Sequence, residues 1–589
     1  MSATYELQRL ISPDLEICDE LRLYAHRVRN ADYSFSGKEW RLAIGGSLSF
    51  GTLFGAFSIG KWRRLTGLAH LSLRLDLEGE GEVTLWNWRA GQERRLLATA
   101  TFSGTDPLEV EIPIAQDADG ILAPIITAWT PTRVRGGAWV TPELPRRPVR
   151  LGIVITTFRR EAAVRATAKR LHRHLVGDPD VDATLIVVDN GRTLTEQDIP
   201  MGVLIPNSNL GGSGGFARGL VWLQDEGSFT HAVFMDDDAS AEIESVRRAI
   251  RLLCYVEDPR TAVVSALLYE ERPGIQLEAA GQMPRDAWMP ARPGVDLRRI
   301  ENLVENELPF PVDYGGWWMF FFPLAEAHLL PFPFFVRGDD VEFPRANGFP
   351  LATLNGIASF GPDFHRKESP VNVALDRRGN LVNVLLHGSV GTGYLAVLRG
   401  LQKSVMLANR YCYDHVDAIV EGTRDVLAGP ASFDNPVDFV GGRRREFAAC
   451  VRQRRLAAGQ MPDYAMAIPR RRGWLWHITR LLLANGHLLP RFLLLRRPAI
   501  LGTVWNTPGA EVFLRPRVLI HEGLDGSAIL AERDAVRYFR SLASTIWVAL
   551  RLMLVLPRVR DDFRGARARF GSRAWWDRQF RAENGHQVD

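Results

Sequence analysis

Three consecutive aspartates, Asp236 to Asp238, follow an apolar run at residues 231–235 that is typical of a buried strand. In open α/β sheets, ligands bind beyond the carboxyl ends of the strands. Asp236 and Asp238 stand two positions apart, so both carboxylates can bind one Mg2+ or Mn2+ ion, which in turn neutralises a diphosphate. We therefore predict that they are metal ligands. The alternative is a solvated acidic turn in which Asp238 caps a helix.

A second acidic pair, Asp339 and Asp340, follows the apolar residues 334–336. A carboxylate in this position is suited to act as the general base that removes a proton from a hydroxyl group. The alternative is a helix N-terminus capped by Asp339. Farther along the chain, His365 is a candidate third metal ligand, and the alternative for this lone histidine is an ordinary surface or core residue.

Other polar segments come at the ends of predicted strands. Residues 156–160 and 189–191 each follow an apolar run, and residues 207–215 include four glycines within five positions. Glycine lets a backbone pass close to a ligand, although this segment lacks the Gly-Lys-Ser/Thr of a P-loop. The strand ends converge on one edge of a parallel sheet, where they can hold a base, a ribose and a diphosphate. Each segment alone is also ordinary turn chemistry.

Two tryptophans, Trp317 and Trp318, follow two glycines and precede a run of phenylalanines at residues 320–322. An aromatic run of this kind is more often part of a core than of a binding site. Paired aromatic rings beside a polar cluster also suit stacking on the faces of sugars.

The order of the elements that position these residues predicts a multidomain α/β protein. Residues 1–148 contain alternating apolar and polar positions, as at residues 71–78, and predict a β-sandwich. Residues 149–384 alternate strands with helices, which predicts a Rossmann-like domain with a mixed, mostly parallel sheet. Residues 385–589 predict a mainly helical domain.

The composition excludes some classes of function. The chain has 589 residues, of which 46% are apolar and 24% charged, and its formal net charge is only +4. This balance is typical of a folded globular protein and gives no sign of nucleic-acid binding. The four cysteines form no CxxC pair and the N-terminus lacks a signal-peptide pattern, so we expect a cytoplasmic location.

Arginines alternate with tryptophan and leucine late in the chain. This pattern suits a protein that rests on the inner face of the cell membrane, and the alternative is a helical domain with solvated arginines. The apolar stretch at residues 543–557 is interrupted by Arg551 and falls short of the roughly 18 uninterrupted apolar residues of a spanning helix.

These motifs, in this order, resemble the inverting nucleotide-sugar glycosyltransferases of the GT-A fold, and among them the polymerising galactofuranosyltransferases of mycobacterial galactan synthesis. The resemblance extends over nearly the whole chain. It rests on the Asn-Leu-Gly-Gly-Ser-Gly-Gly run at residues 209–215, the three aspartates, the Gly-Trp-Trp at residues 316–318 and the later Asp-Asp pair. It implies an N-terminal β-sandwich, a GT-A domain and a helical C-terminal domain.

The resemblance also implies roles for single residues. Asp340 is the implied catalytic base, with Asp339 beside it. Trp317 and Trp318 are implied to lie next to the sugar and the acceptor, and Gln282 matches a glutamate near the donor sugar. The implied metal ligands are Asp236, Asp238 and His365. The implied donor-binding residues are Arg160, Asn190, Asn209 and Asp237.

The implied reaction is a single in-line displacement with inversion at the anomeric carbon, assisted by Mn2+ or Mg2+. The expected donor is UDP-galactofuranose, and the expected acceptor is a lipid-linked galactan or a related surface polysaccharide. One alternative is a GT-A transferase for another nucleotide sugar, such as a rhamnosyl or glucosyl donor. A second alternative is a non-catalytic carbohydrate-binding scaffold. We also expect a homo-oligomer.

Overall fold

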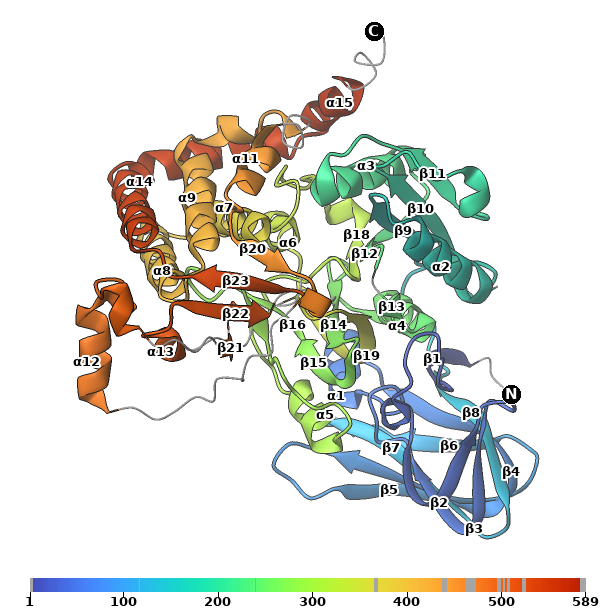
Figure 1. Ribbon diagram of the computed structural model, residues 1–589. Helices are drawn as coiled ribbons and strands as arrows, with labels where there is room; N and C mark the ends of the chain where they lie inside the picture. Colours follow the sequence, from blue (N-terminus) through green and yellow to red (C-terminus); the bar gives the residue numbers. More distant parts are fainter. Residues whose placement is uncertain are drawn as a thin grey trace.

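The computed structural model describes residues 4–115, 117–178, 180–238, 240–364, 369–436, 442–460, 473–494, 499–501, 504–505, 509–521 and 526–582. Figure 1 shows three regions of different architecture. An antiparallel sheet forms the N-terminal region, a mixed sheet flanked by helices forms the centre, and long helices with a small sheet form a C-terminal arm, which begins at residue 370.

The N-terminal region is an eight-stranded antiparallel sheet built around the 19-residue strand β4. In β4, the alternating residues Leu71, Leu73, Leu75 and Leu77 are at most 3% exposed, as the alternation predicts. The strands are β1 (Tyr5–Leu10), β2 (His26–Ser34), β3 (Glu39–Ser49), β4 (His70–Trp88), β5 (Arg95–Gly104), β6 (Leu108–Pro113), β7 (Ile121–Ala128) and β8 (Thr132–Thr141). One helix, α1 (Ile59–Thr66), interrupts them.

The pairing of these strands differs from the predicted β-sandwich of two sheets. The first half of β4 pairs with β6 and β8, and its second half pairs with β5 and β7. Strand β3 pairs with both β7 and β8, so the hydrogen bonding closes on itself in one continuous sheet. Gly79 lies where β4 passes between its two sets of partners, and its φ of +132° favours glycine. A single long strand therefore serves both halves.

The central sheet has the strand order β11-β10-β9-β12-β18-β14-β19-β13, with β15 paired to β14. Its strands are β9 (Arg150–Thr157), β10 (Asp182–Asp189), β11 (Val203–Pro206), β12 (His231–Asp236), β13 (Ser240–Ala241), β14 (Ala262–Tyr269), β15 (Arg272–Glu278), β18 (Phe320–Pro323) and β19 (Leu351–Gly361). A separate short ribbon pairs β16 (Ala280–Gln282) with β17 (Met289–Ala291).

The sheet is mixed, as predicted, but parallel pairing dominates only one half of it. Strands β11, β10, β9 and β12 run parallel to one another. Strand β18, which the phenylalanine run forms, is antiparallel to both of its neighbours, β12 and β14. The prediction of a mostly parallel sheet is therefore too strong, because β18 runs in the opposite direction between the two halves.

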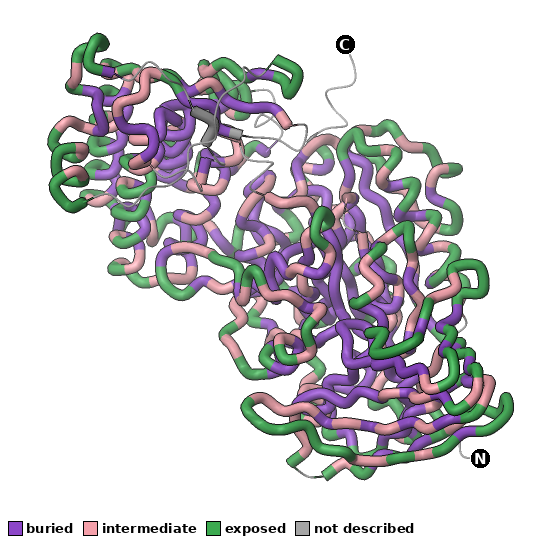
Figure 2. The backbone as a smooth tube through the Cα atoms, turned by 60° about the horizontal axis from the view of Figure 1, so that its bottom comes forward, coloured by how far each residue is buried: buried purple, intermediate pink, exposed green. Residues whose placement is uncertain are grey.

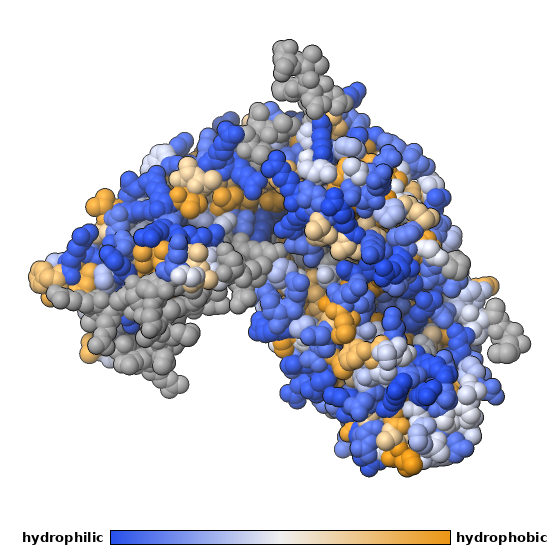
Figure 3. Space-filling model, turned by 45° about the vertical axis from the view of Figure 1, so that its right-hand side comes forward, coloured by the Kyte–Doolittle hydropathy of each residue, from blue (hydrophilic) through white to orange (hydrophobic). Residues whose placement is uncertain are grey.

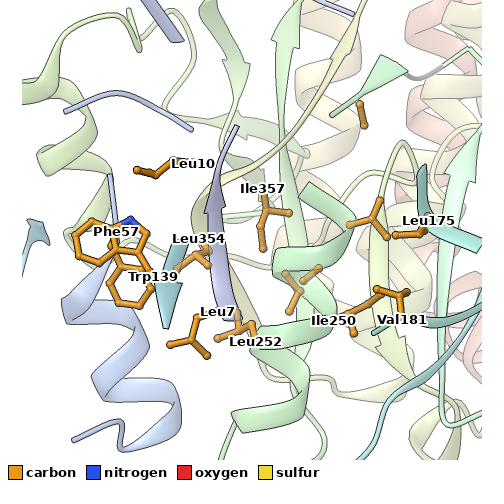
Figure 4. Packing of buried hydrophobic residues seen from close by; sticks show 14 of the residues in the cluster. Leu7, Leu10, Phe57, Trp139, Leu175, Val181, Ile250, Leu252, Leu354 and Ile357 are labelled. Carbon is orange, nitrogen blue, oxygen red and sulfur yellow. The ribbon is translucent and has the colours of Figure 1, made fainter. Parts of the chain in front are cut away.

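Five helices accompany the central sheet: α2 (Glu161–Leu171), α3 (Gly211–Glu226), α4 (Ile243–Tyr255), α5 (Ile300–Glu307) and α6 (Asp339–Asn347). Helix α3 packs on β9 and β10, and α4 packs between β19 and β1 of the N-terminal sheet. One hydrophobic core continues across this junction. Figure 4 shows Leu7 of β1 beside Leu252 of α4, and Leu10 of β1 and Leu354 of β19 belong to the same core. The two sheets therefore share a core through α4.

The C-terminal arm is mainly helical, as predicted, but it also contains a four-stranded sheet that the sequence did not indicate. Its helices are α7 (Pro370–His387), α8 (Val390–Ala408), α9 (Tyr413–Leu427), α11 (Arg444–Ala449), α12 (Trp474–Leu482), α13 (Gly509–Val512), α14 (Ala535–Phe570) and α15 (Arg573–Ala582). Its strands are β20 (Arg454–Leu456), β21 (Ala499–Leu501), β22 (Arg517–His521) and β23 (Ala528–Glu532). The predicted boundary at residue 384 falls inside α7.

Helix α14 is the longest element of the arm. Among the described residues it alone is long and apolar enough to cross a membrane, and a third of its most apolar window is buried in the protein. It packs along α8 and α9, and its C-terminal half reaches back toward the central sheet. Buried and exposed residues alternate along α14, whereas Figure 2 shows mostly buried chain in the middle of the molecule. This alternation is typical of a helix that lies on the surface of a folded domain.

Candidate active site

The parallel register brings three strand ends together, as the sequence predicts. Asp236 at the end of β12 is the register partner of Thr156 in β9. Asp189 at the end of β10 is the partner of Thr157. The polar residues that follow these strands therefore lie along one edge of the sheet, where open α/β sheets bind their ligands.

Asp237 and Asp238 share one arginine at this edge. The Asp237 side chain is buried and accepts hydrogen bonds from Thr157 Oγ1 at 2.8 Å and Arg160 Nη1 at 3.0 Å. The same Arg160 nitrogen lies 2.7 Å from Oδ2 of Asp238. Arg160 precedes α2 and is about half exposed. The predicted uridine-binding arginine thus contacts the acidic turn directly.

The acidic edge fits a hard divalent cation. Burial, followed by the charges of Asp238, Asp237, Asp340 and Asp339, raises the pKa of Asp236 well above its ordinary value. A divalent cation relieves such a concentration of negative charge, and carboxylate oxygens are its preferred ligands. Within the described part of the chain, no group of three or more His, Cys, Asp or Glu side chains is arranged so that it could hold a metal ion. The third predicted ligand, His365, lies outside the described residues.

The second acidic pair begins helix α6, immediately after a strained loop. Phe335, Arg337 and Gly338 all have positive φ values, of 74°, 70° and 103°. Such a backbone turn is costly for residues that carry a side chain and is held in place by its surroundings. Asn383 of α7 donates a hydrogen bond of 2.9 Å to the carbonyl of Gly338. The loop therefore fixes the direction in which the first residues of α6, Asp339 and Asp340, point.

Asp339 and Asp340 face different surroundings. Asp339 is buried and accepts a hydrogen bond of 2.7 Å from Ser213 Oγ in α3. Asp340 lines the cavity described below. Burial raises the pKa of both carboxyls, and the neighbouring charge of Asp339 raises the pKa of Asp340 further. Adjacent residues point in different directions, so Asp340 faces the cavity whereas Asp339 faces Ser213. A general base must be presented to its ligand in this way.

The glycine-rich segment packs beneath this loop. Gly211, the first residue of α3, has a φ of +72°, and a Cβ atom built on it would lie 2.0 Å from the carbonyl oxygen of Phe335. Ser213 donates its backbone N–H to the same carbonyl at 3.2 Å. The glycines thus allow α3 to contact the loop that carries Asp339. This contact gives the segment a structural role in addition to the predicted role near a nucleotide.

The two predicted donor-binding asparagines behave differently. Asn190 is buried, donates to the carbonyl of Gly211 at 3.0 Å and accepts from Asn207 Nδ2 at 2.9 Å, so it joins β10 to the start of α3. Asn209 accepts from the Gly211 backbone N–H at 3.2 Å. Its buried Nδ2 has no hydrogen-bond partner among the described residues. Asn209 therefore has a donor to offer a ligand, whereas the Asn190 side chain serves the fold.

A cavity of about 380 Å3, which we call the catalytic cavity, opens in front of Asp340. Several aromatic residues, among them Trp288, Tyr314 and Trp318, form part of its wall together with Arg337. This combination suits a sugar, because aromatic rings stack on its apolar faces while polar groups bind its hydroxyls.

The structure separates the paired tryptophans. Trp318 lines the catalytic cavity and donates its indole N–H to the Ser265 carbonyl at 3.3 Å. Trp317 is 4% exposed and packs edge-on against Phe216 and Phe234 in the core. The prediction that both lie beside the sugar therefore agrees with the position of Trp318 only. Trp317 takes the alternative, a place in the core, because the neighbouring phenylalanines enclose it.

Glu278 is a cavity residue that sequence reasoning missed. It lies at the end of β15 and lines the catalytic cavity, and burial together with the charge of Asp340 raises its pKa well above the ordinary value. Gln282, which was matched to a donor-site glutamate, instead donates to the Pro311 carbonyl at 2.9 Å. Glu278 lies four positions before Gln282 in the sequence, and it contributes an acidic side chain to the wall of the catalytic cavity.

The chain is similar in sequence to known proteins over nearly its whole length. Residues 7–142 match the family model described as the galactofuranosyltransferase 2 N-terminal region. The chain is 26% identical over 475 residues to galactofuranosyltransferase GlfT2 of Mycobacterium tuberculosis, which covers 72% of each chain. It is 25% identical over 648 residues to GlfT2 of Mycolicibacterium smegmatis, which covers 99% of this chain and 97% of that protein.

Two solved structures are similar to part of the chain. S. aureus TarS 1–349 is 10% identical with a TM-score of 0.30 over 51% of this chain and 88% of that chain. The mannosyltransferase PcManGT from Pyrobaculum calidifontis is 13% identical with a TM-score of 0.28, covering 42% and 67%. The sequence relatives cover far more, and on their evidence this chain is a glycosyltransferase that resembles GlfT2 over 99% of its length.

Proposed function

We propose that the chain transfers galactofuranose from UDP-galactofuranose to a lipid-linked galactan or a related surface polysaccharide, with inversion at the anomeric carbon. The observation that carries the proposal is the position of Asp340. It lies in a cavity walled by Trp288 and Trp318, and its charge acts on Asp236 at the acidic edge of the sheet. A base, a sugar-binding wall and a diphosphate-binding edge therefore meet in one place.

In this mechanism, Asp340 accepts the proton of the acceptor hydroxyl while that oxygen attacks the anomeric carbon of the donor. The bond from the anomeric carbon to the UDP oxygen breaks on the opposite face, which inverts the configuration. Asp236 and Asp238 would hold Mn2+ or Mg2+, which supplies positive charge to the diphosphate when it is bound. Asn209 offers its unpartnered Nδ2 to the donor. Trp318 and Trp288 hold the sugar against Asp340 and exclude water from one side of it.

The donor and the metal can be tested together. We expect the protein, given a galactofuranosyl acceptor, to consume UDP-galactofuranose in preference to other UDP- and dTDP-sugars. We expect EDTA to abolish transfer and added Mn2+ or Mg2+ to restore it, because amide and hydroxyl groups alone rarely compensate the charge of a leaving diphosphate. The measurement is UDP release and glycan mass for each donor.

Different outcomes of this assay separate the alternatives. Preferential use of a rhamnosyl or glucosyl donor would replace the galactofuranose assignment but leave a transferase. Binding of glycans without turnover of any donor would favour the non-catalytic scaffold. Full activity in excess EDTA would exclude the metal role of Asp236 and Asp238.

We also propose that the C-terminal arm rests on an anionic membrane surface. Large apolar side chains are exposed on and beside α12, among them Trp474 at 70%, Leu481 at 73%, Leu482 at 72% and Phe492 at 83%. Figure 3 shows apolar side chains on the surface of this part of the molecule. Exposed apolar groups on a helix near arginines are typical of interfacial segments.

The expected homo-oligomer remains a prediction.

Vesicle flotation tests the membrane proposal. We expect the protein to float with anionic but not with neutral vesicles and to be released by high salt, because basic residues contribute through the surface potential. Replacing Leu481 and Leu482 by Ser should prevent flotation. Leu144→Ser is the matched control, since Leu144 is 72% exposed but lies next to the N-terminal sheet. Equal flotation of both variants, or none by the unaltered protein, would exclude this surface.

A further inference from the structure

One side of the catalytic cavity is formed by β15 together with residues 288–293, which we call the wall segment and which include the cavity residue Trp288. The Ala279 N–H, directly after β15, donates a hydrogen bond of 2.9 Å to the Ala291 carbonyl in the wall segment. Arg292 has a φ of 51°, a conformation that is costly for a residue with a side chain and persists only where its surroundings hold it. The groups that hold Arg292 therefore determine the position of this wall.

Gln276 of β15 holds the wall segment from behind. Its side chain is buried, and Nε2 donates a hydrogen bond of 2.7 Å to the carbonyl of Arg292. Its Oε1 accepts a hydrogen bond of 3.0 Å from Nδ2 of Asn306 in α5. Gln276 lies two positions before the cavity residue Glu278 and does not itself line the catalytic cavity. One buried amide therefore joins the strand that carries Glu278, the wall segment and α5.

Helix α5 is in turn held by the N-terminal region. Figure 1 shows α5 where the N-terminal sheet meets the central sheet. Lys61 of α1 donates from Nζ to the Asn306 carbonyl at 3.0 Å and to Thr353 Oγ1 of β19 at 3.1 Å. Ser58, just before α1, donates to Oε1 of Glu307 at 2.8 Å. The hydrogen bonds therefore run without a break from α1 through α5 to the wall segment.

This network is enclosed by the two regions that it joins. The side chains of Lys61 and Glu307 are 12% and 3% exposed and lie 3.9 Å apart. Asn355 of β19 donates to Oε1 of Glu307 at 2.6 Å. Lys61, Gln276, Asn306 and Asn355 all line one small cavity of about 20 Å3. Hydrogen bonds are electrostatically stronger in such surroundings than in water, and a connected buried network is rigid.

We propose that Gln276 is a positioning residue for transfer, which holds the wall segment against the bound sugar, and that Lys61 and Glu307 extend this support to the N-terminal region. The inference rests on the proposed function for the identity of the sugar. Gln276 acts through Trp288 and Glu278, the cavity residues on either side of it in this network. A displacement of about 1 Å in a group that positions a substrate can lower the rate by roughly 100-fold.

The test replaces Gln276 by Leu, which is similar in size but makes neither hydrogen bond. We expect KM for a galactofuranosyl acceptor to rise and kcat/KM to fall by roughly 10- to 100-fold. We also expect faster amide hydrogen exchange in residues 288–295, because local opening becomes easier there. Gln8→Leu is the matched control, since Gln8 is also buried and donates to the Ala56 carbonyl at 2.8 Å within the N-terminal region. It should leave KM and the exchange of the wall segment unchanged.

A paired change tests the part of the N-terminal region. Combining Lys61→Met with Glu307→Gln removes both charges, so neither is left alone in the protein. We expect this double variant to speed exchange in the wall segment and to raise KM, by less than Gln276→Leu does. Combining Arg27→Met with Asp32→Asn is the control, because it removes an exposed ion pair of the same region and should change neither quantity.

The outcomes that contradict the inference are distinct. Unchanged KM and unchanged exchange in Gln276→Leu overturn it. A lower kcat at constant KM, with faster exchange along the whole chain, assigns Gln276 to stability alone and also overturns it. Unchanged exchange of the wall segment in the Lys61 and Glu307 double variant excludes the support from the N-terminal region. If the unaltered protein transfers no galactofuranose, the proposed function is overturned, and the exchange of the wall segment still decides whether Gln276 holds it.

Discussion

Replacing Asp340 by Asn is expected to lower the rate of transfer by roughly 10²–10⁴-fold, the usual effect of losing a general base. The amide keeps the size and the hydrogen-bonding capacity of the side chain but cannot accept the acceptor proton. UDP affinity measured in the presence of metal should change little, because Asp340 lines the sugar cavity whereas the predicted metal ligands end and follow β12.

Asp339→Asn is the matched comparison for this variant. The Asp339 carboxylate already accepts a hydrogen bond from Ser213, so we expect it to position the helix rather than take the proton, and its loss should reduce transfer less. Because burial and Asp339 raise the pKa of Asp340 above the ordinary 3.8, transfer by the unaltered protein should fall as acidification protonates Asp340 at a pH well above 3.8. Near-normal turnover by Asp340→Asn, with loss in Asp339→Asn, would move the base by one residue.

Replacing Arg567 by Met is expected to destabilise the protein by about 3–5 kcal/mol, which is the usual cost of leaving one member of a buried ion pair without its partner. Arg567 of α14 forms a two-pronged pair with Glu342 of α6, including a contact of 2.8 Å from Nη2 to Oε2. Glu342 is fully buried. Denaturant unfolding gives the change in the free energy of unfolding, and transfer activity reports the position of α6.

Two further variants control for the charge change. Arg573→Met breaks the ion pair of Arg573 with Asp225, where both side chains are about half exposed, and should change stability by only about 0–1 kcal/mol. Combining Glu342→Gln with Arg567→Met should recover part of the lost stability, because no uncompensated charge remains. A loss for Arg567→Met no larger than that for Arg573→Met would contradict the importance of the buried pair.

The sequence predicts the strand ends of the site because they depend on local rules. An apolar run followed by polar residues identifies β12 and Asp236, and parallel pairing with β9 places Asp236 beside Thr156. The same reasoning locates Asp339 and Asp340 at the start of a helix. The sequence leaves open which carboxylate of each acidic cluster faces the ligand.

Contacts between distant segments decide the remainder. Trp317 and Trp318 are adjacent and of the same type, so the local sequence does not tell which of them is enclosed in the core. The packing of Phe216 and Phe234 against Trp317 decides this. Glu278 escapes notice because a lone glutamate at a strand end has no motif. Its place in the cavity wall depends on the pairing of β15 with β14, where Glu278 is the register partner of Leu267. Strands of three to five residues, such as those of the arm, are too short to show a period.

The pairing of Arg567 with Glu342 has a consequence for the synthesis of the protein. The two residues are 225 positions apart, so at about 5–20 residues per second the ribosome needs roughly 10–45 s to supply the arginine after the glutamate. During that interval, the helix that begins with Asp339 and Asp340 has a carboxylate to bury and no guanidinium to neutralise it. The helix that carries the predicted general base therefore cannot gain this ion pair until the last turns of α14 have been translated.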